Sequence, residues 1–318
     1  MTPRELAMRF DGRSAVVVGD VMIDEYLFGH ATRISPEAPV MVIHHDRSMK
    51  LLGGAANVAR NLAALGAKVS LIGVTGQDND GHELSELLKA EKITFKRIFD
   101  PSRKTTRKTR VIADHSHQVL RIDSEDSHAV SGALQHDLID GVRQFAGKSD
   151  VIVLSDYLKG TLSEAVAQAA IQEGKQLSIP VLANPKPRSL KHYAGADLVT
   201  LNRAEAAHAL GELALADADA PAAAAKLKET LGARAVLVTL GGSGMVCASD
   251  QSFSIAAPRV EVADPAGAGD TVIASCALGA SVLGVSDPLV YETAARLAAI
   301  VVQRVGVAVP TPSDIASI

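Results

Sequence analysis

The chain has 318 residues, enough for one large α/β domain or for a main domain with an appendage. Hydrophobic residues make up 47% of it, aromatic residues only 3%, and Trp is absent, so aliphatic side chains must build the core. A formal net charge of −4 gives no basic surface for nucleic acid or an anionic membrane. The most apolar run, residues 272–285, is too short to span a bilayer. Two cysteines without metal-ligand spacing and a charged N-terminus without an apolar signal segment favour a cytoplasmic protein.

A buried strand is predicted at residues 14–19, where a β-branched run stops at a glycine. Asp20 and Asp24 follow this strand. Ligands of open α/β sheets collect beyond the carboxyl ends of the strands, so both carboxylates are candidates for binding the hydroxyl groups of a sugar. A helix cap and an exposed turn acid are the simpler interpretation of the same two residues.

Residues 33–40 contain two prolines and cannot be helical, and a strand is expected at residues 40–45. Gly53 and Gly54 then open a helix that ends near Gly66. Paired glycines let a ligand approach the backbone, and Asn57, one turn inside, offers a donor and an acceptor. A close contact between the helix and a sheet would also explain the glycines. A strand at residues 68–73 and a helix at residues 82–91 follow.

The side chains of residues 104–123 alternate as in the strands of a β-hairpin. A period of two places Lys104, Lys108 and Arg110 on one face, and Arg107 and Thr109 on the other. A basic stripe in a mildly acidic protein indicates a bound anion such as a substrate phosphate. A solvated strand face is the alternative.

From residue 149 onward, strands alternate with helices, as in a parallel sheet with ligands at one edge. Strands are expected at residues 149–154, 180–183, 198–201 and 235–240, and helices at residues 164–173, 220–231 and 287–304. Each of the four strands ends in polar or glycine residues. The candidate ligand-binding residues at these ends are Asp156, Asn184, Lys186, Asn202, Glu205, Thr239, Gly241, Gly242 and Gly244.

Three of these strand ends have a predicted role. Lys186 could reach a phosphate where the preceding Asn-Pro pair turns the chain. Asn202 and Glu205 lie three residues apart at a helix start and could orient Mg²⁺ or its waters, although the same spacing is a plain capping pattern. The glycine-rich residues 239–244 offer a wall for a nucleotide.

Residues 264–271 are the stretch on which the other predictions depend. A β-like run at residues 252–262 leads into them and the apolar run leads out as a helix. Gly267, Ala268 and Gly269 would let successive backbone N–H groups converge at the start of that helix and form an anion hole. Asp270 would lie beside it, placed to take a hydroxyl proton while the amides hold a phosphoryl group. A glycine-rich turn that Asp270 merely caps is the alternative.

Two common phosphate-binding patterns are absent from the sequence: the P-loop pattern, and Gly-x-Gly-x-x-Gly after the first strand. The motifs at residues 53–66 and 264–270 resemble the two signature motifs of the ribokinase-like carbohydrate kinases. Residues 19–24, 33–40, 154–160 and 202–205 are similar to the branch of that family that acts on heptose phosphates. The resemblance covers nearly the whole chain.

The resemblance implies a three-layer α/β/α sandwich over residues 1–318, with a central, mostly parallel sheet and a small β-sheet lid from about residues 25–50 and 104–123. It implies a kinase that uses ATP and Mg²⁺, with a monovalent cation as a further candidate, and a homodimer formed through the lid. The implied reaction phosphorylates O1 of a heptose 7-phosphate, towards ADP-heptose for lipopolysaccharide. Asp270 would be the base and Gly267 to Gly269 the anion hole. Asp24, Gly53, Gly54 and Asn57 would hold the sugar, with Lys108 and Arg110 on the lid.

Three features depart from the family pattern. Pro265-Ala266 replaces a Val/Ala-Thr pair, which removes a hydroxyl that could contact nucleotide or a monovalent cation. Asn184 stands where many relatives have Asp, which removes a charge that could attract Mg²⁺. Bifunctional relatives carry a C-terminal nucleotidyltransferase domain, which is not expected here.

Two other functions fit the sequence. One is a kinase of the same fold for another sugar, such as ribose, fructose or a nucleoside. The other is a non-catalytic sugar-binding sensor, which would need the pocket but not Asp270.

Overall fold

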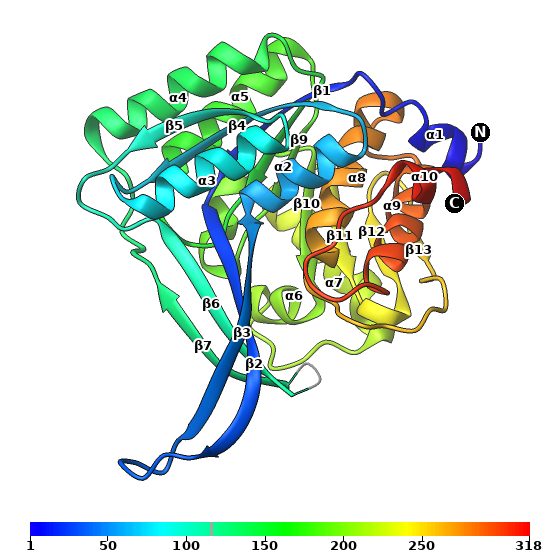
Figure 1. The fold of residues 1–318 in the computed structure, drawn as a ribbon. Coiled ribbons are helices and arrows are strands. Elements are labelled where there is room, and N and C mark those ends of the chain that lie inside the picture. Colours follow the sequence, from blue (N-terminus) through cyan, green and yellow to red (C-terminus); the bar gives the residue numbers. More distant parts are fainter. Residues whose placement is uncertain (115–116) are drawn as a thin grey trace.

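The structure, a computed structural model, describes residues 1–114 and 117–318. It contains a nine-stranded sheet covered by helices on both faces, and a four-stranded sheet that projects from one edge of this body (Figure 1). The predicted three-layer sandwich with a small β-sheet lid is confirmed.

The large sheet has the strand order β13-β12-β11-β10-β9-β8-β1-β4-β5. The strands from β11 to β5 are parallel to their neighbours, whereas β12 and β13 pair antiparallel. Their bounds are β1 Ser14–Gly19, β4 Lys68–Thr75, β5 Thr94–Phe99, β8 Val151–Ser155, β9 Val181–Asn184, β10 Leu198–Asn202, β11 Ala235–Thr239, β12 Met245–Ala248 and β13 Ser252–Ile255.

Alternate residues of the central strands feed two separate cores, because successive side chains of a strand point to opposite faces. In β1, Val17 packs in one core and Val16 and Val18 pack in the other. The first core contains α1 (Pro3–Ala7), α2 (Ala55–Ala64), α3 (Asn79–Ala90), α8 (Ala268–Leu283) and α9 (Pro288–Val301). The second contains α4 (Gly132–Ala146), α5 (Glu164–Leu177), α6 (Arg203–Ala209) and α7 (Ala220–Leu231).

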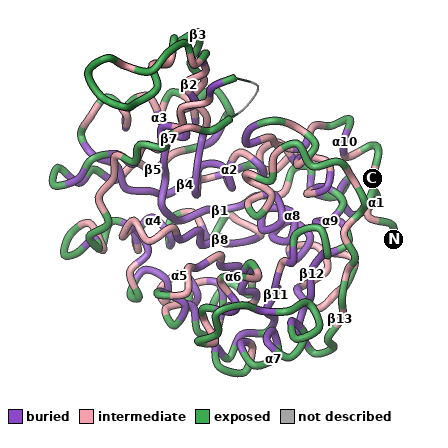
Figure 2. Tube along the Cα trace, turned by 90° about the horizontal axis from the view of Figure 1, so that it is seen from below, coloured by how far each residue is buried: buried purple, intermediate pink, exposed green. Residues whose placement is uncertain are grey.

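The lid sheet has the order β3-β2-β6-β7, with β2 Val21–Ile34, β3 Met41–Gly54, β6 Thr106–Ala113 and β7 His117–Ser124. Residues 35–40, where prolines exclude a helix, connect the two strands of the long β2–β3 hairpin. The tip of the predicted hairpin at residues 104–123 includes residues 115–116, which lie outside the described residues. The far end of the lid is largely exposed, in contrast to the buried strands of the main sheet (Figure 2).

One boundary prediction is wrong. Only Ser252–Ile255 of the run predicted as β-like up to residue 262 is a strand, because β13 is the edge strand and nothing pairs with the chain beyond it. A short helix that the sequence did not predict, α10 (Pro312–Ser317), lies near the end of the chain, and Thr311 and Asp314 cap it reciprocally. No helix in the described part of the chain is long and apolar enough to cross a bilayer.

The edge of the sheet that carries the polar residues is closely packed at Gly19. A Cβ atom on Gly19 would lie 2.1 Å from the backbone oxygen of Ser155 on the neighbouring strand β8. We therefore expect Gly19→Ala to lower the free energy of unfolding by roughly 1–3 kcal/mol, measured by urea denaturation. Gly147 has a φ of −63°, and a Cβ atom there would meet no other atom within 4 Å. Gly147→Ala is therefore the matched control and should leave stability unchanged or slightly raised. Equal losses in both variants would contradict this account of the packing.

Candidate active site

Two neighbouring cavities open at the carboxyl ends of the parallel strands, beside the start of α8. The first has a volume of about 190 Å³ and the second about 480 Å³, and both are lined by Thr239, Gly269 and Val272. The other polar or glycine residues that line the first cavity are Tyr157, Asn184, Lys186, Thr200, Asn202, Glu205, Gly267 and Asp270.

The predicted anion site lies at the start of α8. Gly267 is its N-cap, with a φ of 82° that favours glycine, and the amide of Thr271 makes the first turn with the carbonyl of Gly267 at 3.0 Å. The backbone N–H groups of Gly269 and Asp270 have no acceptor among residues 1–114 and 117–318. These amides and the positive end of the helix dipole face one region that suits an anion.

The carboxylate of Asp270 is held between two donors. Asn57 Nδ2 donates to Oδ2 at 2.7 Å, and the hydroxyl of Tyr157 donates to Oδ1 at 2.8 Å. Burial is the main cause that raises the pKa of Asp270 to about 6, and Asp24 acts in the same direction. The two hydrogen bonds and the charge of Lys186 lower this pKa. Asp270 can therefore accept a proton from a hydroxyl group near neutral pH.

Helix α2 fixes Asn57 against α8 through a chain of buried side chains. Asn61 donates to the carbonyl of Asn57 at 2.9 Å, and Thr271 donates to Asn61 Oδ1 at 2.8 Å. Asn57 Oδ1 is buried and has no hydrogen-bond partner among the described residues. An oxygen without a partner beside Asp270 is suited to receive a ligand hydroxyl.

The structure does not bring Asp20 into the cavity. It is 1% exposed, and its carboxylate accepts the backbone amides of Tyr157, Lys159 and Thr161 at 2.8, 2.9 and 3.0 Å. Burial, followed by the charge of Asp156, raises the pKa of Asp20. Its contacts shape the loop that follows β8, which we call the 156–161 loop.

The carboxylate of Asp156 is likewise engaged in hydrogen bonds within the protein. It accepts hydrogen bonds from the amide of Leu158, the hydroxyl of Ser189 and the hydroxyl of Tyr193 at 2.7, 2.5 and 2.7 Å. The residue of this loop that lines the first cavity is Tyr157, which the sequence analysis did not select as a candidate. The polar run after a buried strand was the available signal, but it does not tell which side chain faces the cavity.

Asp24 lies on β2, 7% exposed, and Arg110 of β6 donates to its Oδ1. A Cβ atom on Gly53 would lie 2.3 Å from Asp24 Oδ2, and one on Gly54, whose φ is 57°, would lie 2.4 Å from the carbonyl of Asp20. Both glycines therefore allow the end of β3 to pack closely beside β2, which brings Asp24 next to α2.

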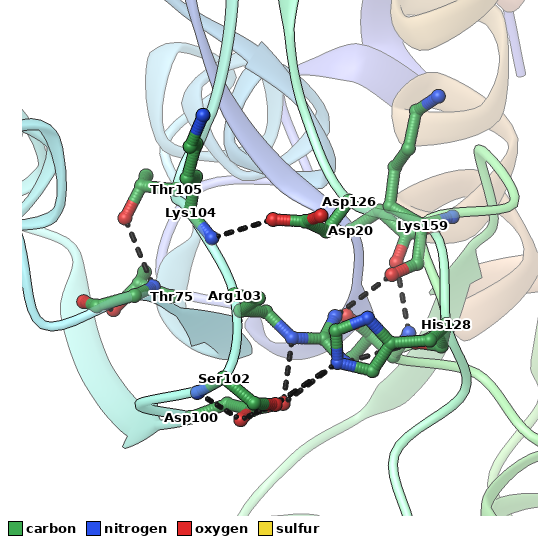
Figure 3. A network of polar contacts seen from close by, with 12 residues as sticks. Asp20, Thr75, Asp100, Ser102, Arg103, Lys104, Thr105, Asp126, His128 and Lys159 are labelled. Atoms are coloured by element: carbon green, nitrogen blue, oxygen red, sulfur yellow. Dashed lines mark hydrogen bonds and ion pairs between the residues drawn. The ribbon is translucent and has the colours of Figure 1, made fainter.

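The strand register places the basic lid residues as the period of two predicts. Lys108 lies opposite Asp24 on one neighbouring strand and opposite Asp123 on the other. Arg107 occupies the other face, where it makes ion pairs with Glu25, Asp80 and Glu83. Lys104 precedes β6, is exposed, and donates its backbone N–H to Asp126 at 2.8 Å (Figure 3).

Lys186 and Glu205 form the opposite wall of the first cavity. Their Nζ and Oε1 atoms lie 2.6 Å apart, and Lys186 Nζ lies 4.9 Å from the ring centroid of Tyr157. Asn202 and Glu205 form the capping box of α6, which was one of the two interpretations of their spacing. Asn184 donates to the hydroxyl of Thr200 at 2.9 Å.

The described residues contain no group of three or more His, Cys, Asp or Glu side chains that could hold a metal ion by itself. The first cavity does contain Glu205 and the amide side chains of Asn184 and Asn202. Mg²⁺ commonly binds through one or two carboxylates together with substrate phosphates and water, so this donor set fits Mg²⁺ that arrives with a nucleotide.

The second cavity has one glycine-rich wall and one apolar wall. Gly241, Gly242 and Gly244 follow β11 on the first side. The apolar wall is formed by side chains from residues 257–262, from α9 and from the residue that follows α9, among them Val260, Val262, Ala295, Ala298 and Val302. Gly269, whose N–H has no acceptor among the described residues, lines this cavity as well.

Comparisons with known proteins identify the family of this chain. The model of the pfkB family of carbohydrate kinases matches residues 13–314. The chain is 41% identical over 314 residues to the bifunctional protein HldE of Caulobacter vibrioides, covering 98% of this chain and 64% of that protein. It is also 41% identical over 306 residues to HldE of Citrifermentans bemidjiense, covering 95% of this chain and 62% of that protein. The chain thus spans just under two thirds of the length of these relatives.

Solved structures of similar fold cover nearly the whole chain. Phosphofructokinase-2 from Escherichia coli in complex with potassium has a TM-score of 0.80 at 18% identity, covering 96% of this chain and 97% of that one. A putative ribokinase from Agrobacterium tumefaciens has a TM-score of 0.76 at 16% identity, with the same coverage. At these identities the structures show the shared fold, whereas the family match extends over the two cavities and the start of α8. The chain therefore belongs to the pfkB family of carbohydrate kinases.

Proposed function

We propose that this kinase transfers the γ-phosphoryl group of ATP to O1 of D-glycero-β-D-manno-heptose 7-phosphate. The observation that carries the transfer is the carboxylate of Asp270 beside the unpaired amides of Gly269 and Asp270. The choice of sugar rests on the resemblance of residues 19–24, 33–40, 154–160 and 202–205 to heptose phosphate kinases. The product would be the 1,7-bisphosphate, which leads towards ADP-heptose.

The proposed transfer uses the carboxylate of Asp270 and the free backbone amides at the start of α8. The sugar hydroxyl donates to Asp270 and loses its proton to this carboxylate as its oxygen attacks the γ-phosphorus. The bond from that phosphorus to the bridging oxygen of ADP breaks. The free amides at the start of α8 hold the transferring group while its charge is spread over the equatorial oxygens. Ala268 and the flanking glycines keep this backbone open to the ligand.

The proposed nucleotide site is the second cavity, with Thr239, Gly241, Gly242 and Gly244 against the nucleotide and Lys186 near its phosphates. Glu205, Asn184 and Asn202 would hold Mg²⁺ or its waters beside those phosphates. When bound, the ion would neutralise charge on the phosphates. A monovalent cation stays a prediction.

The proposed sugar site lies between α2 and the lid. Asp24 and Asn57 would bind hydroxyl groups there, where Gly53 and Gly54 leave room beside the backbone. Lys104, Lys108 and Arg110 would attract the phosphate that the substrate already carries.

We also propose that two chains pair through the outer faces of their lids. Leu120 and Ile122 are each 53% exposed, and their register with Val111 and Thr109 places them on the face opposite Lys108. Apolar side chains gathered on an exposed sheet face favour pairing with a second copy.

The proposed donor, ATP, is available in the cytoplasm, and we expect the kinase to act there.

Asp270→Asn should keep its affinity for the sugar and lose roughly 10²- to 10⁴-fold in kcat, because the amide cannot take the hydroxyl proton. The measurement is steady-state phosphate transfer from ATP to the heptose phosphate. Asp140, an exposed acid on α4, provides the control Asp140→Asn, which should have wild-type kcat. Unchanged turnover in Asp270→Asn would exclude this residue as the base.

The pH profile should report the raised pKa of Asp270. The base acts in its ionised form, so kcat/KM should fall as the pH is lowered through about 6. Tyr157→Phe removes a donor that favours the ionised form, so the acidic limb should move to higher pH. A limb that stays in place or moves to lower pH would contradict the role assigned to the Tyr157 hydroxyl.

Lys108→Ala and Arg110→Ala should raise KM for the phosphorylated sugar far more than KM for ATP, because both cations lie on the lid and away from the nucleotide cavity. Arg110→Ala also leaves the carboxylate of Asp24 without its cation, so its thermal stability is measured in parallel. Arg143→Ala, on the surface of α4, is the control. Equal increases in KM for sugar and ATP would contradict the lid assignment.

A further inference from the structure

The 156–161 loop joins both ends of the proposed sugar site. Tyr157 lies at the reacting end, where its hydroxyl donates to Asp270 at 2.8 Å. Two residues later, Lys159 lies beside the lid, where its Nζ atom is 2.6 Å from Oε1 of Glu125, the residue that follows β7. One short loop therefore connects the proposed base with the basic face of the lid.

The backbone of Lys159 is held on both sides by buried charges. Its N–H donates to Asp20 at 2.9 Å, and its carbonyl accepts from Arg103 at 2.8 Å. Arg103 is paired at 2.8 Å with Asp100, and both side chains are almost fully buried. Figure 3 shows this network, with the side chain of Lys159 extending away from the Asp100–Arg103 pair. Gly160, with a φ of 88°, packs against the carbonyl of His128 and leaves no room for a Cβ atom.

Lys108 and Lys159 are close enough to affect each other. Burial and then the charge of Lys159 lower the pKa of Lys108, while Glu125, Asp123 and Asp24 act in the opposite direction. The register of three strands puts Asp24, Lys108 and Asp123 side by side on the face that looks towards the sugar site. Glu125 lies two residues after Asp123. Because Lys159 contacts Glu125, it meets the lid on this same face.

Unused donors remain on both ammonium groups. The ammonium group of Lys108 makes no hydrogen bond or ion pair within 4.0 Å among the described residues, although Lys108 is only partly exposed. Lys159 has a single carboxylate contact, to Glu125, and an ammonium group carries three N–H donors. Two neighbouring cations with free donors in a partly buried position favour an anion between them.

We propose that Lys159 binds, together with Lys108, the phosphate that the sugar substrate already carries, and that its loop sets the distance from this phosphate to the hydroxyl presented to Asp270. This inference rests on the proposed function and extends it to a residue outside the predicted lid. The loop that carries Tyr157 and Lys159 is rigidly held, so a sugar phosphate of the wrong length cannot reach both ends at once.

The test compares Lys159→Met, Lys159→Arg and Glu125→Gln in steady-state kinetics. The acceptors are heptose 7-phosphate, sugar 6- and 5-phosphates and the unphosphorylated sugars. Lys159→Met should raise KM for the best phosphorylated sugar by about 10- to 100-fold, the scale of a lost charge-assisted contact, with KM for ATP within about threefold. Its preference for that sugar over the unphosphorylated one should shrink by the same factor. Lys159→Arg should recover part of the affinity.

Glu125→Gln separates binding from structure, because it weakens the same ion pair and leaves the cation in place. We expect its KM values to stay within about threefold of wild type, and thermal melts confirm that each variant is folded. Equal effects of Lys159→Met and Glu125→Gln, or no effect of Lys159→Met, would overturn the inference. If the wild type prefers another sugar phosphate, the proposed substrate fails and Lys159 is tested on that sugar. If a phosphate on the sugar gives the wild type no advantage, both proposals fail.

Discussion

The hydrogen bond from Asn57 to Asp270 is the interaction on which the rest of the site depends. It joins residues 213 positions apart and ties the start of α2 to the start of α8. The bond at 2.7 Å fixes one carboxylate oxygen, and Tyr157 contacts the other. These two contacts position the proposed base from two distant parts of the chain: one comes from α2, which follows the lid strand β3, and the other comes from the loop after β8.

Several buried charges of this molecule support the site without lining it. Asp20 binds three backbone amides, and Asp156 binds one amide and two hydroxyls, so both stabilise the conformation of the loop between them. The buried Asp100–Arg103 pair holds the same loop from the side of the lid. Burying carboxyl and guanidinium groups costs free energy, and the hydrogen bonds and the ion pair of these side chains offset part of that cost. The benefit is a rigid loop that presents Tyr157 to Asp270.

Patterns within a single strand or helix were predictable from the sequence. The β-branched run of β1, the repeated strand–helix order from β8 to β11 and the glycine-rich start of α8 were all found where the sequence indicated. Strand periodicity also separated Lys108 and Arg110 from Arg107, because the side chains of a strand alternate whatever its surroundings. The edge strand β5 was not predicted, and the end of the edge strand β13 was predicted too far along the chain. Whether a segment at the edge of a sheet forms a strand depends on its pairing with a neighbour, which the sequence of the segment does not show.

What each polar side chain does was less predictable than where it lies. Asp20 and Asp24 look alike in the sequence, yet Asp20 faces the amides of the 156–161 loop and Asp24 faces Arg110. Gly53 and Gly54 are required by close packing against Asp24 and the carbonyl of Asp20, whereas the alternative from the sequence was a contact between the helix and a sheet. The positions of Tyr157 and Lys159 were not predictable because they depend on the buried partners of the loop, which come from distant parts of the chain.

A crystal structure with ADP, aluminium fluoride, Mg²⁺ and the sugar phosphate would test the central claim most directly. Aluminium fluoride mimics the transferring phosphoryl group. It should bind at the amides of Gly269 and Asp270, with the acceptor hydroxyl within hydrogen-bond distance of the Asp270 carboxylate. A fluoride complex bound away from the start of α8, or an acceptor hydroxyl directed at another residue, would contradict the account.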